Sequence, residues 1–275
     1  MPPTAERRCG NLSRVSGSFS GKTAAYYAKY RRGYPDQIIS AVIDRLHLGS
    51  GDTVVDLGCG TGLLTVPFAL RVRLVVGMDP EPDMLAEARR VVDPATGSKI
   101  VWVLGSDADL PALAALRGED GWGAVTVGQA LHFMDHTALF GRAREMLRPG
   151  GGVAIISNGV PLWQQDSDWS RALSSALEDW FHTPSSSTCG TADADRARYR
   201  SALREAGFAV EEASYQYKAK ITFDDVIGGL FSAISPTDVP DEVRDAFTQH
   251  IAQALPEAVT FTETVPVTAL IGIAA

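Results

Sequence analysis

The fold of this chain is constrained most by one stretch, TVVDLGCGTG at residues 53–62. Val54 and Val55 belong to a short β-branched, apolar run without helical period, which is typical of a parallel strand buried on both faces. An acidic residue and three alternating glycines follow, and glycine lets the backbone turn sharply and a ligand approach the main chain. A helix starting within residues 63–70 would direct its free N–H groups at that ligand. The stretch predicts a strand, a ligand-binding loop and a helix.

The spacing of the glycines distinguishes this loop from the dinucleotide-binding fingerprint. G-x-G-x-x-G places its third glycine where this chain has Leu63. The pattern D-x-G-x-G-x-G instead resembles the first motif of the class I S-adenosylmethionine-dependent methyltransferases. This resemblance implies that S-adenosylmethionine is the cofactor, with S-adenosylhomocysteine as its product. The expected cofactor-binding residues of the loop are Asp56, which attracts the methionine ammonium, and Gly58, Gly60 and Gly62.

A second acidic position follows the next predicted strand, residues 74–79. Asp79 stands 23 residues after Asp56. In doubly wound folds that bind nucleosides, an acid about 20 residues past the glycine loop accepts hydrogen bonds from ribose. A helix N-cap is the alternative role, since Pro80 to Asp83 open a helix. We expect ribose binding, and the resemblance places Met84 near the adenosine.

The resemblance continues through the third, fourth and fifth predicted strands, residues 100–104, 123–127 and 153–157. It implies that Asp107, with Ala108 beside it, binds the adenine amino group. It also places the residues after the fourth strand, beginning with Gln129, next to the transferred methyl group. The family feature Leu-x-Pro-Gly-Gly is present at residues 147–151.

His132 and Asp135 are the candidate catalytic residues. A histidine among apolar residues is usually packed and satisfied by one backbone bond. The carboxyl end of a parallel strand, however, is where ligands bind in open α/β sheets, and a near-neutral histidine can accept a substrate proton. Both interpretations of His132 remain open. Asp135 precedes a helix expected over residues 138–147, so a capping role competes with catalysis.

Tyrosines and cations are concentrated just before the first strand, at residues 26–35. One interpretation is an amphipathic helix whose tyrosines cover the edge of the core. The other, which we favour, is a lid over the cofactor, because methyltransferases of small molecules often carry Tyr-x-x-x-Arg-x-x-Tyr-Pro here. Tyr27 and Arg31 then bind the cofactor, and Tyr30 contacts the substrate.

An insertion at residues 158–195 interrupts the α/β alternation. It is rich in tryptophan and carries a net charge of −5, with Arg171 as its one basic residue. A helical pair with a solvated acidic face is the usual explanation. The alternative is a substrate cap whose carboxylates select a polyol or a cationic amine. The candidate substrate-binding residues in it are Trp163, Asp166, Glu178 and His182.

The whole pattern predicts a Rossmann-like, doubly wound α/β fold, with the sheet order 3-2-1-4-5-7-6 implied by the resemblance. The later elements are a helix at 196–208, a strand at 209–220, helices at 222–231 and 242–255, and a strand at 259–273. The expected organisation is a mobile tail at 1–20, a helical lid at 21–48 and a cofactor-binding core at 49–157. The cap insertion at 158–195 follows, and residues 196–275 complete the core and add further cap helices.

Charge and composition limit the classes of partner. The net charge is −8, but residues 1–35 carry +6, which leaves −14 on the remainder. The three cysteines, Cys9, Cys59 and Cys189, suggest neither a disulfide framework nor a metal site. No run is long enough to span a bilayer and no secretory leader is visible, so we expect a soluble cytoplasmic protein, monomeric or homodimeric, with no membrane or nucleic-acid partner.

The resulting functional hypothesis is methyl transfer from S-adenosylmethionine to nitrogen or oxygen of a polar small molecule. The acidic insertion favours an aminated sugar of secondary metabolism, such as one from antibiotic biosynthesis. A phenolic or carboxylate metabolite is the nearest alternative. The basic N-terminal segment keeps an RNA or protein substrate open, and a noncatalytic S-adenosylmethionine-binding module is a remote option.

Overall fold

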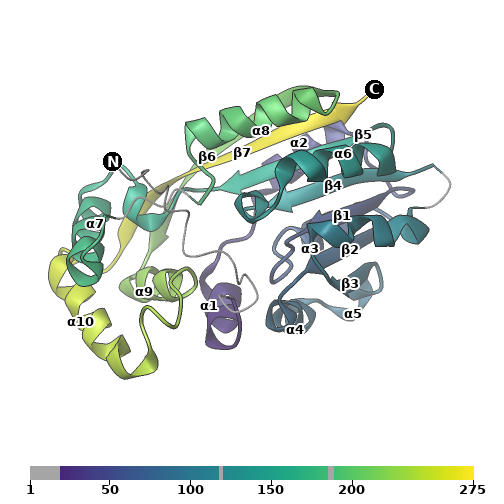
Figure 1. The fold of residues 1–275 in the computed structure, drawn as a ribbon. Coiled ribbons are helices and arrows are strands. Elements are labelled where there is room, and N and C mark those ends of the chain that lie inside the picture. The colour runs from purple at the N-terminus through teal and green to yellow at the C-terminus, as the bar shows by residue number, and fades with distance from the viewer. Residues whose placement is uncertain (1–18, 118–119, 185–188) are drawn as a thin grey trace, which may run out of the picture.

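The computed structural model describes residues 19–117, 120–184 and 189–275. It contains a seven-stranded sheet with the order β3-β2-β1-β4-β5-β7-β6 (Figure 1), which confirms the predicted fold class. The strands are β1 (Thr53–Leu57), β2 (Leu74–Asp79), β3 (Ile100–Leu104), β4 (Trp122–Gly128), β5 (Leu147–Asn158), β6 (Phe208–Ile221) and β7 (Phe261–Ala274). β1 to β5 are mutually parallel, and β7 pairs antiparallel with both β5 and β6.

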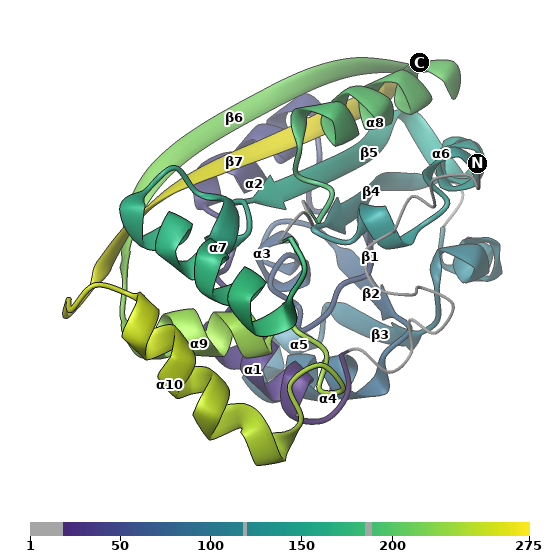
Figure 2. The ribbon, with the colours of Figure 1, turned by 60° about the vertical axis from the view of Figure 1, so that its left-hand side comes forward.

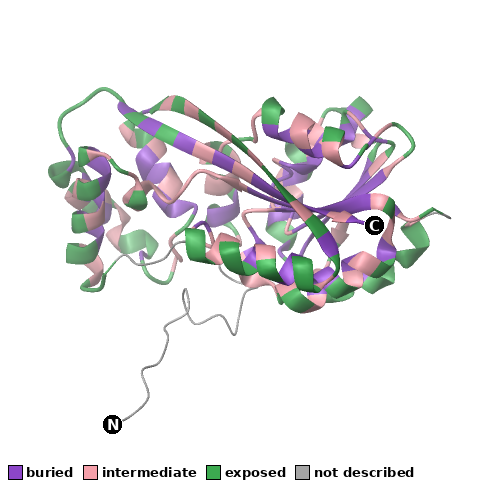
Figure 3. Ribbon diagram, turned by 90° about the horizontal axis from the view of Figure 1, so that it is seen from above, coloured by how far each residue is buried: buried purple, intermediate pink, exposed green. Residues whose placement is uncertain are grey.

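Helices cover both faces of the sheet and give each face its own apolar core. The helices of one face are α2 (Asp36–Arg45), α3 (Thr65–Ala69) and α4 (Pro82–Val91), followed by the short α5 (Pro94–Gly97). The other face is covered by the 3-10 helix η2 (Asp107–Leu116), α6 (His136–Met146) and α8 (Asp193–Glu205). Every residue of β1 is buried, as expected of a central strand in a doubly wound sheet. Figure 3 shows the same burial along the other central strands.

A third apolar core lies beyond the carboxyl ends of β4 and β5. β6 and β7 extend past the other strands, and their far ends pack with α7 (Asp168–Phe181), α9 (Phe223–Phe231) and α10 (Arg244–Ala254). Figures 1 and 2 show these three helices gathered at that end of the molecule. The 3-10 turns η4 (Leu162–Gln164) and η5 (Asp241–Val243) complete this region. We call α7, α9, α10, η4 and η5 the cap.

Helix α1 (Lys22–Tyr30) lies between the cap and the cofactor-binding half of the sheet. Gly21 N donates to Asp83 Oδ2 of α4 at 2.6 Å, and Lys22 Nζ donates to Asp241 Oδ2 at 2.6 Å. α2 behaves differently, because Ile38, Ile39 and Val42 are buried in the core of the sheet. Of the segment predicted as a lid at 21–48, α2 therefore belongs to the core, and the lid role of α1 stays a prediction.

Several predicted boundaries differ from the observed ones. β5 already begins at Leu147, because Leu147 pairs with Trp122 of β4, and the Arg-Pro-Gly-Gly segment forms an irregularity in the ladder before pairing resumes at Gly152. α8 begins at Asp193, so the last residues of the predicted 158–195 insertion belong to a core helix. The described part of that insertion has one long helix, α7, whose partner is α10 from later in the chain. The mobile tail predicted at 1–20 lies, apart from residues 19 and 20, outside the described residues.

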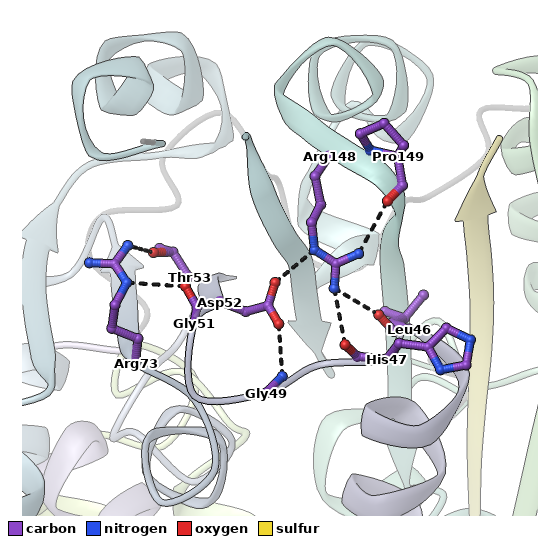
Figure 4. Close-up of polar contacts among 9 residues, drawn as sticks. All are labelled: Leu46, His47, Gly49, Gly51, Asp52, Thr53, Arg73, Arg148 and Pro149. Carbon is purple, nitrogen blue, oxygen red and sulfur yellow. Dashed lines mark hydrogen bonds and ion pairs between the residues drawn. The ribbon is translucent and has the colours of Figure 1, made fainter. Parts of the chain in front are cut away.

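The amino-terminal edge of the sheet is held together by Arg148 (Figure 4). Its Nε donates to Asp52 Oδ1 at 2.7 Å, and its Nη2 donates to the carbonyls of Leu46 and His47 at 3.1 and 3.2 Å. Asp52 Oδ2 accepts a further bond from Gly49 N at 2.7 Å. Arg148 thus joins the α2–β1 connection to the start of β5. The arginine of the Leu-Arg-Pro-Gly-Gly feature has a structural role at the edge opposite the ligand-binding ends of the strands.

Arg148→Ala is expected to lower the free energy of unfolding by about 2–4 kcal/mol, because it leaves the half-buried Asp52 carboxylate and two carbonyls without their donor. Denaturant titration measures this change. Arg90→Ala is the control, since the Arg90–Glu87 pair lies on an exposed helix surface and should contribute less than about 1 kcal/mol. Equal effects of the two substitutions would contradict the role assigned to Arg148.

Within the described ranges, no helix combines the length and the apolar character needed to cross a membrane.

Candidate active site

The glycine loop follows β1, and each of its three glycines has a positive φ: +64° at Gly58, +53° at Gly60 and +83° at Gly62. A Cβ at Gly58 would lie 2.6 Å from Ala130 Cβ, and one at Gly62 would lie 2.9 Å from Trp102. These two positions therefore require glycine for both conformation and packing. They hold the loop against the ends of the neighbouring strands.

Gly60 faces the lid and not the core. A Cβ there would meet only Tyr27 of α1, at 3.9 Å. The neighbouring Thr61 hydroxyl is buried and has no hydrogen-bond partner among the described residues. Open space above a glycine, an aromatic wall and an unpaired hydroxyl suit a bound nucleoside, so the residues present fit S-adenosylmethionine.

Asp56 lies under the loop and is almost completely buried. Its two carboxylate oxygens accept hydrogen bonds from Thr65 Oγ1 at 2.6 Å and Thr126 Oγ1 at 2.9 Å. Burial raises the pKa of Asp56 to about 7, against the lowering effect of both hydroxyls. Asp56 thus fixes the loop to α3 and β4. Its contact with a methionine ammonium stays a prediction.

Asp79 ends β2 and joins the glycine loop to α4. Its Oδ2 accepts from Gly60 N at 2.8 Å and its Oδ1 from Glu81 N at 2.9 Å. Burial raises the pKa of Asp79, although both backbone donors oppose this. Both carboxylate oxygens therefore already serve the protein. Met84 is buried on α4 and faces the same region.

The predicted adenine and methyl contacts have separate surroundings. Asp107 begins η2, is half-buried beside Arg142 at 4.0 Å, and has a pKa raised by burial. Ala108, next to it, is exposed. Gln129 has the unusual φ of +54° for a non-glycine residue, and its Nε2 donates to Asn158 O at 3.1 Å. Such backbone strain at the end of a strand is typical of a functional site.

The side chains of the lid segment contact two different parts of the molecule, the glycine loop and the cap. Tyr27 lies over Gly60, and burial raises its pKa. Arg31 lies 5.3 Å from the centre of the Tyr27 ring, and its Nε donates to Ser232 Oγ at 2.8 Å. Tyr30 points to the cap, where its hydroxyl donates to Asp224 Oδ2 at 2.8 Å and its ring packs on Gly228. Tyr30 thus lies on the side of α1 that contacts the cap.

His132 lines a pocket at the carboxyl ends of β4 and β5, together with Gln129, Ile156 and Tyr199. A Cβ at Gly190 would lie 2.9 Å from Tyr199 Oη and 3.3 Å from His132 Nδ1, so these two polar atoms converge beneath the 189–190 turn. The Tyr199 hydroxyl is buried and makes no hydrogen bond of normal geometry among the described residues. Burial lowers the pKa of His132 to about 4, so its ring is neutral at pH 7.

Asp135 is not directed at this pocket. Its exposed side chain caps α6 by accepting from Ala138 N at 3.1 Å. This geometry favours the capping alternative over the predicted catalytic role.

Three of the four predicted cap residues do not converge. Asp166 is fully exposed and pairs with Arg171 at 2.8 Å, while Glu178 and His182 are exposed on or after α7. Trp163 packs against the apolar core of the cap. The acidic face is therefore solvated, as the simpler interpretation held, and the described pocket around His132 is lined by neutral residues.

Sequence reasoning missed residues that matter here, namely Thr65, Thr126 and Tyr199. Thr65 holds Asp56 from the next helix, nine residues on, and Thr126 holds it from a strand 70 residues away, and no local pattern marks either threonine. Tyr199 is the single aromatic residue of a charged helix rich in aspartate and arginine, and its spacing alone gives no signal. Tyr34 belongs to the predicted lid segment at residues 26–35. Its hydroxyl lies against Gly128, because a Cβ added at Gly128 would be 2.5 Å from Tyr34 Oη.

The fold and this site define a doubly wound α/β protein whose glycine loop is covered by Tyr27 of α1. Comparison with known proteins makes the class specific, because residues 54–151 match a family model described as a methyltransferase domain. An uncharacterized methyltransferase of Mycobacterium tuberculosis is 33% identical over 138 residues, 50% of this chain and 51% of that protein. A trans-aconitate 2-methyltransferase of Pseudomonas aeruginosa is 32% identical over 143 residues, 50% of this chain and 46% of that protein. The chain thus spans about half the length of these relatives.

Solved structures agree with the fold. The YcgJ protein from Bacillus subtilis has a TM-score of 0.53 at 14% identity, over 87% of this chain and 99% of that one. Precorrin 8w decarboxylase from Methanobacterium thermoautotrophicum has a TM-score of 0.52 at 16% identity, over 90% of this chain and 94% of that one. These similarities concern the fold alone. Together with the motifs, the family match supports a class I S-adenosylmethionine-dependent methyltransferase domain at residues 54–151.

Proposed function

We propose that the chain transfers a methyl group from S-adenosylmethionine to an oxygen or nitrogen atom of a polar small molecule. The observation that carries the proposal is the position of the His132 pocket. It lies at the carboxyl ends of β4 and β5, and Ala130, one of its lining residues, packs directly against Gly58 of the glycine loop. An acceptor there would lie next to a donor held by that loop.

S-adenosylmethionine supplies an activated sulfonium methyl group, so the protein mainly has to align the acceptor. Proximity and orientation of this kind lower barriers by up to roughly 7–11 kcal/mol. Neutral His132 can accept a hydrogen bond from the acceptor O–H or N–H, which directs a lone pair toward the methyl carbon. The buried Tyr199 hydroxyl can donate to the same group. The lid residue Tyr27 closes the space above Gly60 and excludes water.

This cavity is small enough to hold only the reacting group of an acceptor, and the group that suits it is uncharged when it reacts, such as the hydroxyl of an alcohol or a phenol or a neutral amine. Among the described residues that line the pocket there is no carboxylate to select a cation. This removes the reason for preferring an aminated sugar, although a sugar amine in its neutral form still fits. The trans-aconitate relative makes a carboxylate acceptor the alternative to test.

The test is a thermal-shift series followed by a methylation assay. S-adenosylhomocysteine alone should raise the melting temperature, because a ligand that binds only the folded state stabilises it by mass action. Panels of alcohols and phenols, aminated sugars, and small carboxylic acids are then added with the nucleoside present. Methyl transfer from S-adenosylmethionine is assayed with every compound that gives a second shift.

A nucleoside shift, a second shift with alcohols, phenols or amines, and turnover of the same compounds support the proposal. A second shift and turnover confined to carboxylic acids would transfer the assignment to that class. Failure of S-adenosylhomocysteine to shift the wild-type chain would contradict cofactor binding and the proposal with it.

The acid limb that depends on His132 should fall near pH 4 and not near 6.5 in the pH–rate profile. His132 has a folded-state pKa lowered to about 4 by burial, so it stays neutral down to that range and loses its acceptor capacity only below it. An ordinary histidine would lose activity through pH 6.5. Measurement of kcat between pH 4 and 8 with saturating donor decides this. An inflection near 6.5 that disappears in His132→Ala would contradict the assigned protonation state.

A further inference from the structure

The two edges of the sheet differ in length. The sheet ends with β3 on one side and with β6 on the other, and Figure 2 shows β6 as the outermost strand. β3 has 5 residues and β6 has 14. A short edge strand protects a sheet from pairing with another chain, whereas a long one presents a row of unpaired N–H and C=O groups. The edge formed by β6 is therefore the one that can pair with a further strand.

The outer edge of β6 is open and regular. On its inner side the strand pairs with β7 from Phe208 to Ile221 without a register shift, so no bulge turns the edge away. Within the described ranges, no other backbone segment bonds to β6. The strand also contains no proline. Short length, bulges and proline are three features by which edge strands avoid pairing, and β6 has none of them.

The side chains of β6 fall on two faces, because successive residues of a strand alternate. One face carries half-buried residues that pack against the apolar core containing α2: Ala213, Tyr215, Tyr217 and Ala219. The other face carries exposed polar residues: Glu212, Ser214, Gln216, Lys218 and Lys220. The rings of Tyr215 and Tyr217 are stacked with their centres 6.1 Å apart. Tyrosines that keep part of their ring exposed are typical of protein interfaces.

The charge on the exposed face of β6 changes sign along the strand. Glu212 stands near the start of the strand, and Lys218 and Lys220 stand near its end. Glu212 pairs with Arg200 of α8 but keeps 37% of its side chain exposed, and neither lysine forms an ion pair within the described residues. An antiparallel copy of this strand would bring opposite charges together, whereas a parallel copy would bring like charges together.

We propose that β6 pairs antiparallel with β6 of a second copy of this chain, so that the two sheets join across a two-fold axis. The axis is perpendicular to the sheet, so each residue pairs with a residue on the same face and the axis passes beside a single residue. We place it at Gln216. This register sets Glu212 opposite Lys220 of the second copy. On the other face it sets Tyr215 opposite Tyr217 of the second copy, and the symmetry makes each contact twice.

The competing register is centred on Tyr215. It sets Glu212 opposite Lys218, but it also sets Tyr217 opposite Ala213, so that a single pair of tyrosines remains. Aromatic pairs across two strands stabilise a sheet more than pairs with alanine do. The register centred on Gln216 therefore satisfies both faces. It leaves only the two short β3 strands as edges of the joined sheet.

Light scattering coupled to size-exclusion chromatography tests for the dimer over a dilution series. The wild type should have twice the chain mass of 29.4 kDa. Lys220→Glu sets like charges opposite each other at two places and should weaken the dimer at least about tenfold. The double variant Glu212→Lys/Lys220→Glu sets opposite charges together again and should recover the dimer. Lys99→Glu, at an exposed position before β3, is the matched control and should leave the mass unchanged.

Disulfide crosslinking tests the register. Gln216→Cys places two thiols at the axis, where opposite residues have Cα atoms about 4.5–5.5 Å apart, within the reach of a disulfide. Oxidation should give a covalent dimer. Ser214→Cys is the control on the same face, because the two copies of this position would be offset by roughly 13 Å along the strands. The wild type, with its native cysteines, is the blank.

A monomer at every concentration would overturn the proposal, and so would a dimer that Lys220→Glu leaves intact. Crosslinking of Ser214→Cys in preference to Gln216→Cys would overturn it as well. Misfolding cannot imitate the expected result, because the double variant should regain a dimer that the single variant loses. The proposal does not depend on the methyltransferase function, since none of these residues lines the pocket of His132 or contacts the glycine loop.

Discussion

Gly60→Ala is expected to reduce affinity for S-adenosylhomocysteine about a hundredfold while leaving the chain folded. An added Cβ would meet no part of the protein except Tyr27, at 3.9 Å, so it occupies the space between loop and lid. That is the space the cofactor must fill. A hundredfold loss corresponds to about 2.7 kcal/mol, within the range of one enforced steric overlap in a tight site.

The conformational cost of the alanine has to be separated from its effect on binding. φ is +53° at Gly60, and a left-handed conformation costs a non-glycine residue roughly 1–2 kcal/mol. Gly207→Ala is the matched control, because Gly207 has φ of +85°, open space around it and a position after α8. Both variants should lose similar stability in denaturant titration, and only Gly60→Ala should lose the ligand. Unchanged affinity in Gly60→Ala would place the cofactor elsewhere.

His132→Ala should lower kcat about a hundredfold with the donor affinity nearly unchanged. Removal of a positioned proton acceptor typically costs 10²–10⁴ in rate. His132 lies in the pocket next to the glycine loop and not in the loop itself, so S-adenosylhomocysteine binding should vary less than about threefold. Kinetics with a compound from the acceptor panel, together with titration of the nucleoside, measure the two effects separately.

His182→Asn is the control for this experiment. His182 is exposed after α7 with φ of +54°, and asparagine tolerates that conformation. Its kcat should match the wild type. If His182→Asn lowered kcat as much as His132→Ala does, the acceptor site would have to lie on the cap surface, as one interpretation of the sequence suggested. An unchanged kcat in His132→Ala would leave His132 as a packing residue.

The sheet was predictable because its signals are local. β-branched runs mark β1 to β4, and the order of the elements follows from the family resemblance. Boundaries were less accessible where tertiary pairing decided them. The Pro-Gly-Gly segment is typical of a turn, yet it lies within β5 as an irregularity, because Leu147 before it and Gly152 after it both pair with β4. Likewise, α2 has the periodicity of any amphipathic helix, and only packing shows that it belongs to the core.

The site could be predicted where a residue of a functional type directly follows a strand. It could be predicted less well where a side chain bonds a residue from another part of the sequence. Asp56 and Asp79 are correctly located at the loop, but their hydrogen bonds to Thr65, Thr126 and backbone amides alter what each can do. The residues next to an acid in the sequence do not show in which direction its side chain points. Asp166, which pairs with Arg171 at the surface, shows this for the cap.

The long strands β6 and β7 have a consequence for how the acceptor region can diverge. Ile221, the last residue of β6, pairs directly with Phe261, the first residue of β7. The chain between them, which contains α9 and α10, therefore leaves and re-enters the sheet at one point, as Figure 2 makes visible. A two-residue turn could join the strands there without changing their register. Residues 222–260 can thus change in length or be replaced without altering the register of the sheet, whereas α1, which bonds Asp224, Ser232 and Asp241 of this segment, would need new partners.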